Sequence, residues 1–230
     1  MRRSFFALAG VLAAGLTAGG LSAQTATEPG SGVAFPLRLA AAGAPGEHVL
    51  TGMGLRTRTV LNVKVYAFGL YVDSTAAAGA LAAWAGKDAK TLQGDATFYE
   101  ALLKLQFPMT LRLLMTRDVD GETMAEAFDG ALRPRVQQAA ATMNMPGGEQ
   151  ALDTFRGYFS VSQMTKESEL VFTCTPDGTL GSRVKGEDKA PIASPALCWA
   201  LFDVYLGAKP ISGNGKKTAI ANFPALLAGR

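Results

Sequence analysis

Histidine is nearly absent from this sequence, since His48 is the only one in 230 residues. A Ser-His-Asp triad and a histidine-based metal site would both depend on that one side chain. It lies in the polar, turn-rich stretch 40–48, so we expect it at the surface and not in catalysis. The sequence also contains no G-x-S-x-G nucleophile elbow. The familiar sets of catalytic residues are therefore missing, and neither a metal nor another cofactor is expected.

Cysteine is almost as scarce, with Cys174 and Cys198 alone. Their spacing fits neither a zinc site nor a redox motif. One falls in a predicted strand and the other in a predicted helix, where each suits a small, buried, apolar side chain. An oxidising compartment would permit a disulfide between them, but we expect two free cysteines.

A strong excess of charge is missing too. The formal net charge is +3, and two of these charges, on Arg2 and Arg3, lie in a segment that we expect to be removed. The remaining charge is weak and scattered along the chain, so nothing indicates nucleic-acid binding. Hydrophobic residues make up 48% of the chain, which is enough for one globular domain with a real core.

Only the N-terminus combines a long apolar run with a basic start. Residues 1–23, MRRSFFALAGVLAAGLTAGGLSA, have the pattern of a signal peptide cleaved after Ala23. The twin arginines before Ser4 leave twin-arginine export open beside the general route. A retained membrane anchor is the alternative, but this Gly- and Ala-rich stretch is poorly hydrophobic for a spanning helix. We expect a periplasmic protein without stable membrane insertion.

Local patterns predict a single α+β domain over residues 33–230, after a disordered lead-in at 24–32. Alternation and turn residues predict strands at 33–39, 55–60, 63–72, 101–107 and 109–119 and a hairpin over 169–186. Helical spacing predicts helices at 74–89, 121–145, 145–160 and 194–207. Pro134 is expected to kink or split the second of these helices. This order favours an antiparallel sheet with helices on one face.

Two short motifs fail as ligand sites. The sequence GMG at 52–54 lacks the third glycine and the following helix of a dinucleotide fingerprint. The sequence DVDGE at 118–122 lacks the spacing and the terminal glutamate of an EF-hand, so we interpret it as the start of a helix.

The first predicted hairpin contains a candidate anion site. If its turn centres on Leu61, Arg56 faces Tyr66 across the two strands, and Arg58 faces Lys64. An arginine fork and a phenol hydroxyl on opposed residues can both donate to one carboxylate. The alternative is a solvent-exposed face, which the two cations nearer the turn favour. Periodicity leaves both interpretations open.

Five short motifs, in order along the chain, resemble those of the chalcone isomerase-like family, specifically its exported bacterial members. They are LTGMGLRTR (50–58), KVYAFGLYV (64–72), WAGK (84–87), TPDGTLG (175–181) and YLGAKPIS (205–212). The resemblance covers roughly residues 33–227. It implies an open-faced β-sandwich, in which a large antiparallel sheet is covered on one face by helices and a ligand cleft lies between the two layers.

The resemblance also implies where the cleft residues lie. The family's cleft arginine falls on Arg56, and the threonine that the plant enzymes carry in the next strand falls on Tyr66. Their active-site tyrosine, asparagine and last-helix threonine fall at about Met124, Ala131 and Val204. These three side chains can neither donate nor accept a useful hydrogen bond. The polar groups that hold water and a phenolate in the true isomerases are thus replaced here.

An arginine kept beside a tyrosine resembles the fatty-acid-binding branch of the family. That resemblance implies a carboxylate held by Arg56 and Tyr66, with an apolar lining that includes Phe68, Met124 and Val204. The expected function is non-catalytic binding of a fatty acid or similar hydrophobic carboxylate. One alternative is an intramolecular lyase, in which Arg56 stabilises an oxyanion and Tyr66 acts as acid or base. A second alternative is an interaction protein whose cleft is filled by its own side chains.

Overall fold

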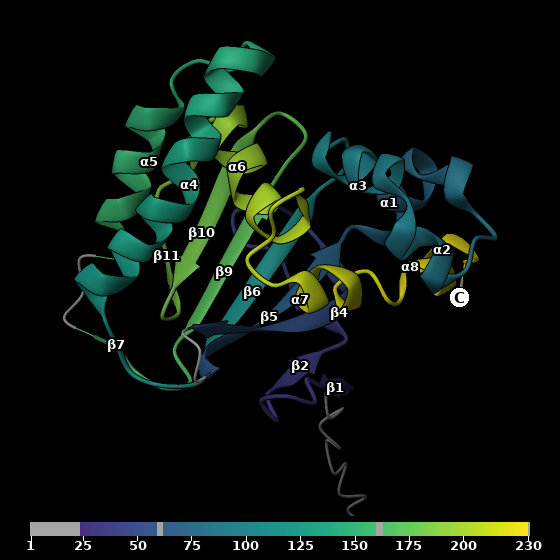
Figure 1. Ribbon diagram of the computed structural model, residues 1–230, viewed down its shortest axis with the longest axis horizontal. Helices are drawn as coiled ribbons and strands as arrows, with labels where there is room; N and C mark the ends of the chain where they lie inside the picture. Colours follow the sequence, from purple (N-terminus) through teal and green to yellow (C-terminus); the bar gives the residue numbers. More distant parts are fainter. Residues whose placement is uncertain (1–23, 59–61, 160–162, 230) are drawn as a thin grey trace, which may run out of the picture.

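A curled antiparallel sheet, with helices packed on one face, organises the chain (Figure 1). The computed structural model describes residues 24–58, 62–159 and 163–229, so the expected signal peptide lies outside the described residues. The strands of the large sheet run in the order β11-β10-β9-β6-β5-β4-β3, and β12 pairs with β10. Their bounds are β3 (Arg38–Ala40), β4 (Glu47–Arg58), β5 (Val63–Val72), β6 (Met109–Met115), β9 (Glu169–Cys174), β10 (Thr179–Val184), β11 (Glu187–Asp188) and β12 (Ile192–Ala193).

Two small ribbons and a set of helices complete the fold. The ribbons pair β1 (Thr25–Thr27) with β2 (Ala34–Pro36) and β7 (Val119–Asp120) with β8 (Gln163–Met164). The helices are α1 (Ser74–Ala80), the 3₁₀ helix η1 (Ala82–Trp84), α2 (Ala89–Gly94), α3 (Ala96–Leu103), α4 (Gly121–Met143), α5 (Gly148–Gly157), α6 (Pro195–Leu206), α7 (Gly213–Thr218) and α8 (Phe223–Leu227). No helix in the described part of the chain is long and apolar enough to span a membrane.

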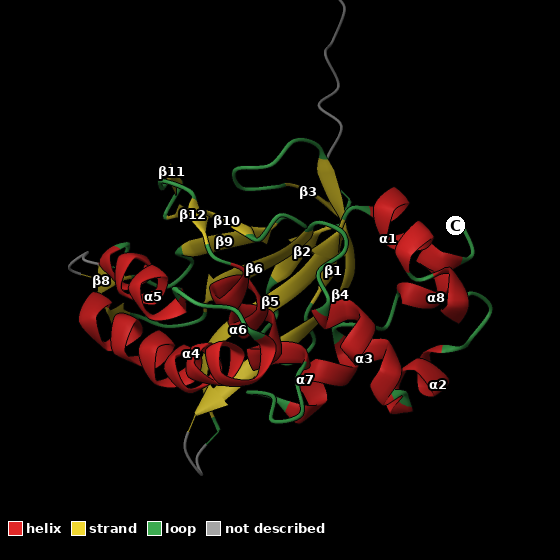
Figure 2. Cartoon of the chain, turned by 90° about the horizontal axis from the view of Figure 1, so that it is seen from above, coloured by secondary structure: helices red, strands yellow, loops and turns green. Residues whose placement is uncertain are grey.

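Helix α6 is the central element of the helical layer. It begins as the sequence predicts, with the Ser194 hydroxyl accepting from the Leu197 N–H and with Pro195 in the first turn. Nearly all of its residues are buried, because it packs against α4, α5 and α3 as well as the sheet (Figure 2). A helix that is apolar all round is the expected occupant of such a position.

The β4–β5 hairpin confirms the predicted pairing of Arg56 with Tyr66. An irregularity between Arg56 and Thr57 then shifts the register, so Lys64 lies opposite Thr57. The expected pairing of Arg58 with Lys64 is therefore wrong, since a β-bulge offsets one strand against the other. The predicted turn centre, residue 61, lies outside the described residues.

The second face of the sheet is covered by the N-terminal segment. Phe35 of β2 is fully buried against Gly69, where an added Cβ would lie 2.8 Å from the Phe35 ring. The Tyr71 hydroxyl donates to the Pro36 carbonyl oxygen across this contact. The lead-in that we expected to be disordered instead contains β1, and the Glu28 carboxylate accepts from the Ser31 N–H.

Several predicted elements differ from the structure. The predicted strand 101–107 is wrong, because Asp95 caps α3 by accepting from the Phe98 N–H and the helix runs through Leu103. The predicted helix 74–89 is divided into α1 and η1, and the strand 33–39 into β2 and β3. Helix α4 remains one helix through Pro134, so the expected split is absent there.

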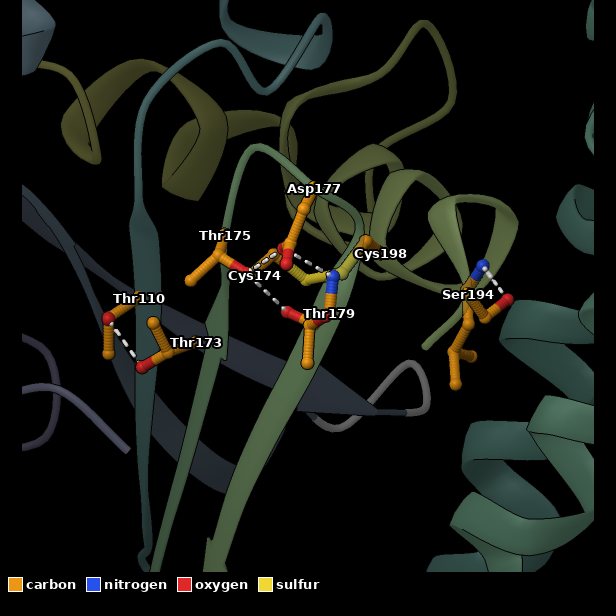
Figure 3. The surroundings of a disulfide bond; sticks show 9 residues. Thr110, Thr173, Cys174, Thr175, Asp177, Thr179, Ser194 and Cys198 are labelled. Atoms are coloured by element: carbon orange, nitrogen blue, oxygen red, sulfur yellow. Dashed lines mark hydrogen bonds between the residues drawn. A yellow bond between two sulfur atoms is a disulfide. The ribbon is translucent and has the colours of Figure 1, made fainter. Parts of the chain in front are cut away.

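The expectation of two free cysteines is also wrong. Cys174, at the end of β9, and Cys198, in the first turns of α6, form a disulfide with Cα atoms 5.7 Å apart (Figure 3). The predicted turn between β9 and β10 is confirmed beside it, where the Asp177 carboxylate accepts from the Thr179 N–H. The disulfide and the neighbouring turn fix the start of α6 to the end of β9.

His48 is buried, with only 1% of its surface exposed, so its expected surface position is wrong. It belongs to β4, and its Nδ1 lies 2.8 Å from the Thr110 hydroxyl oxygen. Thr110 in turn hydrogen-bonds Thr173, whose hydroxyl accepts from the Ala42 N–H. The turn-rich residues therefore fold back over the sheet and cover the histidine. Burial lowers its pKa, and Asp73 opposes that shift.

Candidate functional site

One cavity of about 340 Å³ lies on the helix-covered face, between the β4–β5 hairpin, α4 and the end of α6. Its lining residues divide into an exposed polar mouth and a more apolar interior. The residues that line it are Arg56, Arg58, Val63, Val65, Tyr66, Arg117, Asp118, Val119, Asp120, Thr123, Met124, Ala127, Phe128, Ala131, Leu201, Val204, Tyr205 and Ile211. The cavity is at the small end of the range for small-molecule sites, roughly 300–1,000 Å³.

Arg56 and Tyr66, which lie opposite each other on β4 and β5, both line this cavity. The Arg56 guanidinium lies 5.7 Å from the centre of the Tyr66 ring, within the range of a cation–π contact. Tyr66 is 3% exposed, whereas Arg56 is half-buried. A guanidinium and a phenol are thus presented to the same space, and both can donate hydrogen bonds.

Tyr205 of α6 is a third polar member of the site, which the sequence did not single out. Its hydroxyl lies 2.9 Å from the Tyr66 hydroxyl, and both groups are buried. The Phe68 ring packs against it, with the ring centres 4.8 Å apart. Tyr205 stands beside Val204, a position that the family resemblance implied, but only the tertiary contact between α6 and β5 shows its partner.

The two tyrosines differ in how their surroundings affect ionisation. Burial raises the pKa of Tyr66 above its usual value, and the Arg56 charge and the hydrogen bond with Tyr205 only partly offset that rise. Burial raises the pKa of Tyr205 well above its usual range, and Tyr66 raises it further. Both phenols are therefore protonated at neutral pH, and either hydroxyl can donate the hydrogen bond between them. When Tyr205 donates, the Tyr66 hydroxyl proton is free to bond to a ligand.

The apolar positions implied by the resemblance come together in the same cavity. Met124, Ala131 and Val204 all line it, from α4 and α6. Phe68 does not line it, although it is fully buried on the same face of β5. Its ring lies over Gly54, where an added Cβ would meet it at 2.5 Å, and Phe68 therefore supports Tyr205 from behind.

The mouth of the cavity carries charged residues that the sequence did not assign to a site. Arg58, Arg117, Asp118 and Asp120 line it and are exposed. Asp120 caps α4, as the interpretation of DVDGE as a helix start predicts. Over the described residues, no group of three or more His, Cys, Asp or Glu side chains is placed to hold a metal ion.

A family model described as chalcone isomerase like matches residues 46–220. The chain belongs to the chalcone isomerase-like family. Its fold also matches a crystal structure of an Arabidopsis thaliana fatty-acid-binding protein with a TM-score of 0.74, at 24% sequence identity, over 89% of this chain and all of that one. The curled sheet with its covering helices is thus the fold of this family.

The chain is similar to relatives of two kinds, fatty-acid-binding proteins and chalcone–flavanone isomerases. Fatty-acid-binding protein 1 of Arabidopsis thaliana is 24% identical over 90% of this chain and 73% of its own length. A chalcone–flavanone isomerase of Oryza sativa subsp. japonica is 28% identical over 85% of this chain and 88% of its own. Overall similarity therefore does not separate a binding protein from an enzyme, and the residues of the cavity must do so.

Proposed function

We propose that this protein binds a fatty acid or a similar hydrophobic carboxylate without converting it. The observation that carries the proposal is the placement of Arg56 and the Tyr66–Tyr205 pair in the wall of an otherwise largely apolar cavity. The relatives named as fatty-acid-binding proteins support the same ligand class. The cavity would take the acyl chain, and the arginine and the tyrosine would hold its carboxylate.

The electrostatics of the site suit a carboxylate. A buried carboxylate is costly unless it is paired with a cation and hydrogen-bonded. Arg56 supplies the positive charge, and the Tyr66 hydroxyl can donate to the carboxylate while it accepts from Tyr205. Charge-assisted hydrogen bonds of this kind contribute about 1.5–3 kcal/mol each.

The rest of the cavity suits an acyl chain. Met124, Ala131 and Val204 offer no hydrogen bond to a reacting group and present only apolar surface. Each methylene transferred from water to such surface contributes about 0.8 kcal/mol. This lining supports binding over catalysis, because it lacks the groups that the family resemblance assigns to the isomerases at these positions.

A comparison of two ligands tests the proposal. Dodecanoate and dodecan-1-ol have the same chain length, and only dodecanoate carries a carboxylate. We expect wild type to bind dodecanoate more tightly in calorimetric titrations, and Arg56→Ala to lower that affinity at least about tenfold while changing the alcohol little. Arg38→Ala, which removes an exposed arginine of β3, is the charge-matched control. Unchanged dodecanoate affinity in Arg56→Ala would falsify the carboxylate site.

An isomerase of the intramolecular lyase class is the second candidate. The placement of the Tyr66 phenol beside the Arg56 guanidinium favours it, as do relatives named chalcone–flavanone isomerases. In that mechanism Arg56 stabilises an oxyanion, while Tyr66 transfers a proton. Turnover of a hydroxychalcone above the uncatalysed rate, lost in both Arg56→Ala and Tyr66→Phe, would support the enzyme over the binding protein.

The alternative of an interaction protein with a closed cleft has lost its main support. That alternative required a cleft filled by the protein's own side chains, whereas an open cavity lies beside Arg56. Ligand binding therefore remains the better explanation for the paired polar groups.

We also propose that the protein is exported to the periplasm after cleavage near Ala23. The pattern of residues 1–23 supports this, and so does the Cys174–Cys198 disulfide, because disulfides persist in oxidising compartments. An intact mass of periplasmic material that starts at Gln24 is the expected result. Recovery of the full-length chain from the cytoplasm would contradict it.

A further inference from the structure

The arginines around the cavity differ from most described arginines of this chain in that they form no ion pair with a described carboxylate. Most arginines in the described residues are in ion pairs, namely Arg112, Arg133, Arg135, Arg156 and Arg183. Four are in no ion pair with a described carboxylate, and three of those four, Arg56, Arg58 and Arg117, line one cavity. Three arginines without an ion-pair partner among the described carboxylates thus gather at one cavity.

The carboxylates of the mouth do not neutralise these arginines by direct contact. Asp118 accepts from the Lys166 N–H at 2.6 Å. Asp120 accepts from the N–H groups of Glu122 and Thr123 at the start of α4. Both carboxylates are therefore engaged with backbone donors, and neither forms an ion pair with a described arginine.

The arginines lie at two depths. Arg56 is half-buried beside Tyr66, whereas Arg58 and Arg117 are exposed. Arg58 ends β4, on one side of β5. Arg117 follows β6, on the other side of β5, where the neighbouring Thr116 N–H donates to the Val65 carbonyl oxygen. The two exposed arginines thus approach the mouth from opposite sides of β5.

We propose that Arg58 and Arg117 form a phosphate subsite at the mouth, and that the ligand is an acyl chain esterified to a phosphate-bearing head group. This inference rests on the proposed binding function and narrows its ligand class. The acyl carbonyl oxygen would accept hydrogen bonds from Arg56 and Tyr66, and the phosphate would lie between the outer arginines.

The chemistry of arginine supports the assignment of the phosphate to the two outer arginines and of the acyl carbonyl to Arg56. A single carboxylate needs only Arg56 and Tyr66, so two further cations exceed the requirements of a simple fatty acid. The planar guanidinium fork matches the oxygens of a phosphate and binds them bidentately. Arg56 and Arg58 are only two positions apart on β4 and line the same cavity, so a short linker between carbonyl and phosphate can bridge them.

Three soluble ligands test the subsite in the full mature protein. They are dodecanoate, dodecan-1-ol and 1-dodecanoyl-glycerol-3-phosphate, each titrated below its micelle concentration. We expect wild type to bind the phosphate ester at least about tenfold more tightly than dodecanoate. The Arg58→Ala/Arg117→Ala double variant should lower the ratio of these two affinities at least about tenfold. Arg38→Ala, a charge-matched control outside the cavity, should leave the ratio unchanged.

The outcomes separate this inference from the proposed function. Dodecanoate binding without preference for the phosphate ester overturns the subsite alone. Absence of binding for both ligands overturns both proposals, whereas binding of the ester alone supports the subsite and removes the free carboxylate as the ligand. A final experiment measures binding to a membrane surface by sedimentation with phosphatidylglycerol vesicles. If the double variant loses vesicle binding but keeps its preference for the soluble ester, the arginines bind a membrane surface and the subsite is wrong.

Discussion

At the scale of single residues, the polar part of the cavity is the hydrogen-bonded pair of Tyr66 and Tyr205 beside Arg56. Tyr205 is buried in α6, and its only hydrogen-bond partner among the described residues is Tyr66. The Tyr205 hydroxyl can donate to Tyr66 and so leave the Tyr66 proton for a ligand. The positive charge of Arg56 acts on the Tyr66 oxygen.

Tyr66→Phe removes that proton and preserves the ring. We expect the affinity for dodecanoate to fall about tenfold, because one charge-assisted hydrogen bond is lost. The affinity for dodecan-1-ol should change much less, and calorimetric titration of both ligands measures the difference. Tyr158→Phe, which removes the hydroxyl of a half-buried tyrosine that does not line the cavity, is the matched control. Equal losses for acid and alcohol would mean that the hydroxyl only maintains the shape of the site.

His48 gives a prediction about pH. Burial lowers its pKa in the folded state, so the unfolded chain binds more protons near its ordinary pKa of about 6.5. The free energy of unfolding should therefore fall as the pH is lowered from about 7 towards 5. Urea unfolding at several pH values measures this in wild type and in His48→Asn, whose amide can still reach Thr110. An identical pH dependence in the variant would exclude His48 as the cause.

The sequence predicts site residues whose partners lie in the same hairpin better than those whose partners are distant along the chain. Arg56 and Tyr66 follow from cross-strand pairing, because both positions lie in one hairpin. Tyr205 could not be found in this way, since its partner lies 139 residues away. Phe68 shares the strand face of Tyr66, but Gly54 opposite it leaves room for its ring to pack below Tyr205. Whether a side chain lines a cavity depends on such neighbours.

At the scale of elements, capping and turn residues correctly predicted the helix starts and turns that depend on contacts between residues close in sequence. Ser194 and Asp120 cap α6 and α4, and the β9–β10 turn forms where expected. The strand predicted at 101–107 was wrong because its partial alternation also fits the end of a helix that Asp95 starts. The surface position predicted for His48 was wrong because a polar sequence context does not show which segment folds over the residue.

The close contact between β4 and α7 gives a prediction at this scale. Gly52 packs against the end of α7, where an added Cβ would lie 2.0 Å from the Thr218 carbonyl oxygen. Gly52→Ala should therefore lower the free energy of unfolding by about 3 kcal/mol, because backbone atoms must move apart. Gly79→Ala, in exposed helix with nothing near the new Cβ, should be neutral or slightly stabilising. Urea unfolding compares the two, and equal stability would contradict the close contact.

At the scale of the whole molecule, two long-range features hold the layers together. The N-terminal segment covers one face of the sheet through Phe35, and the Cys174–Cys198 disulfide joins the helical layer to the other. Neither feature was predicted, because each depends on contacts between distant segments that local patterns do not encode. The single α+β architecture itself was predictable from the order of strands and helices.

The disulfide gives the prediction for the whole fold. It joins residues separated by 24 positions, so it restricts the unfolded chain and should contribute about 3 kcal/mol to stability. The Cys174→Ala/Cys198→Ala double variant and the Cys198→Ala single variant should both lose about this amount in urea unfolding under oxidising conditions. Because neither variant can form the bridge, reductant should destabilise only wild type. A wild-type unfolding curve that is unchanged after complete reduction and refolding would show that the packing of α6 on β9, and not the bridge, joins the two layers.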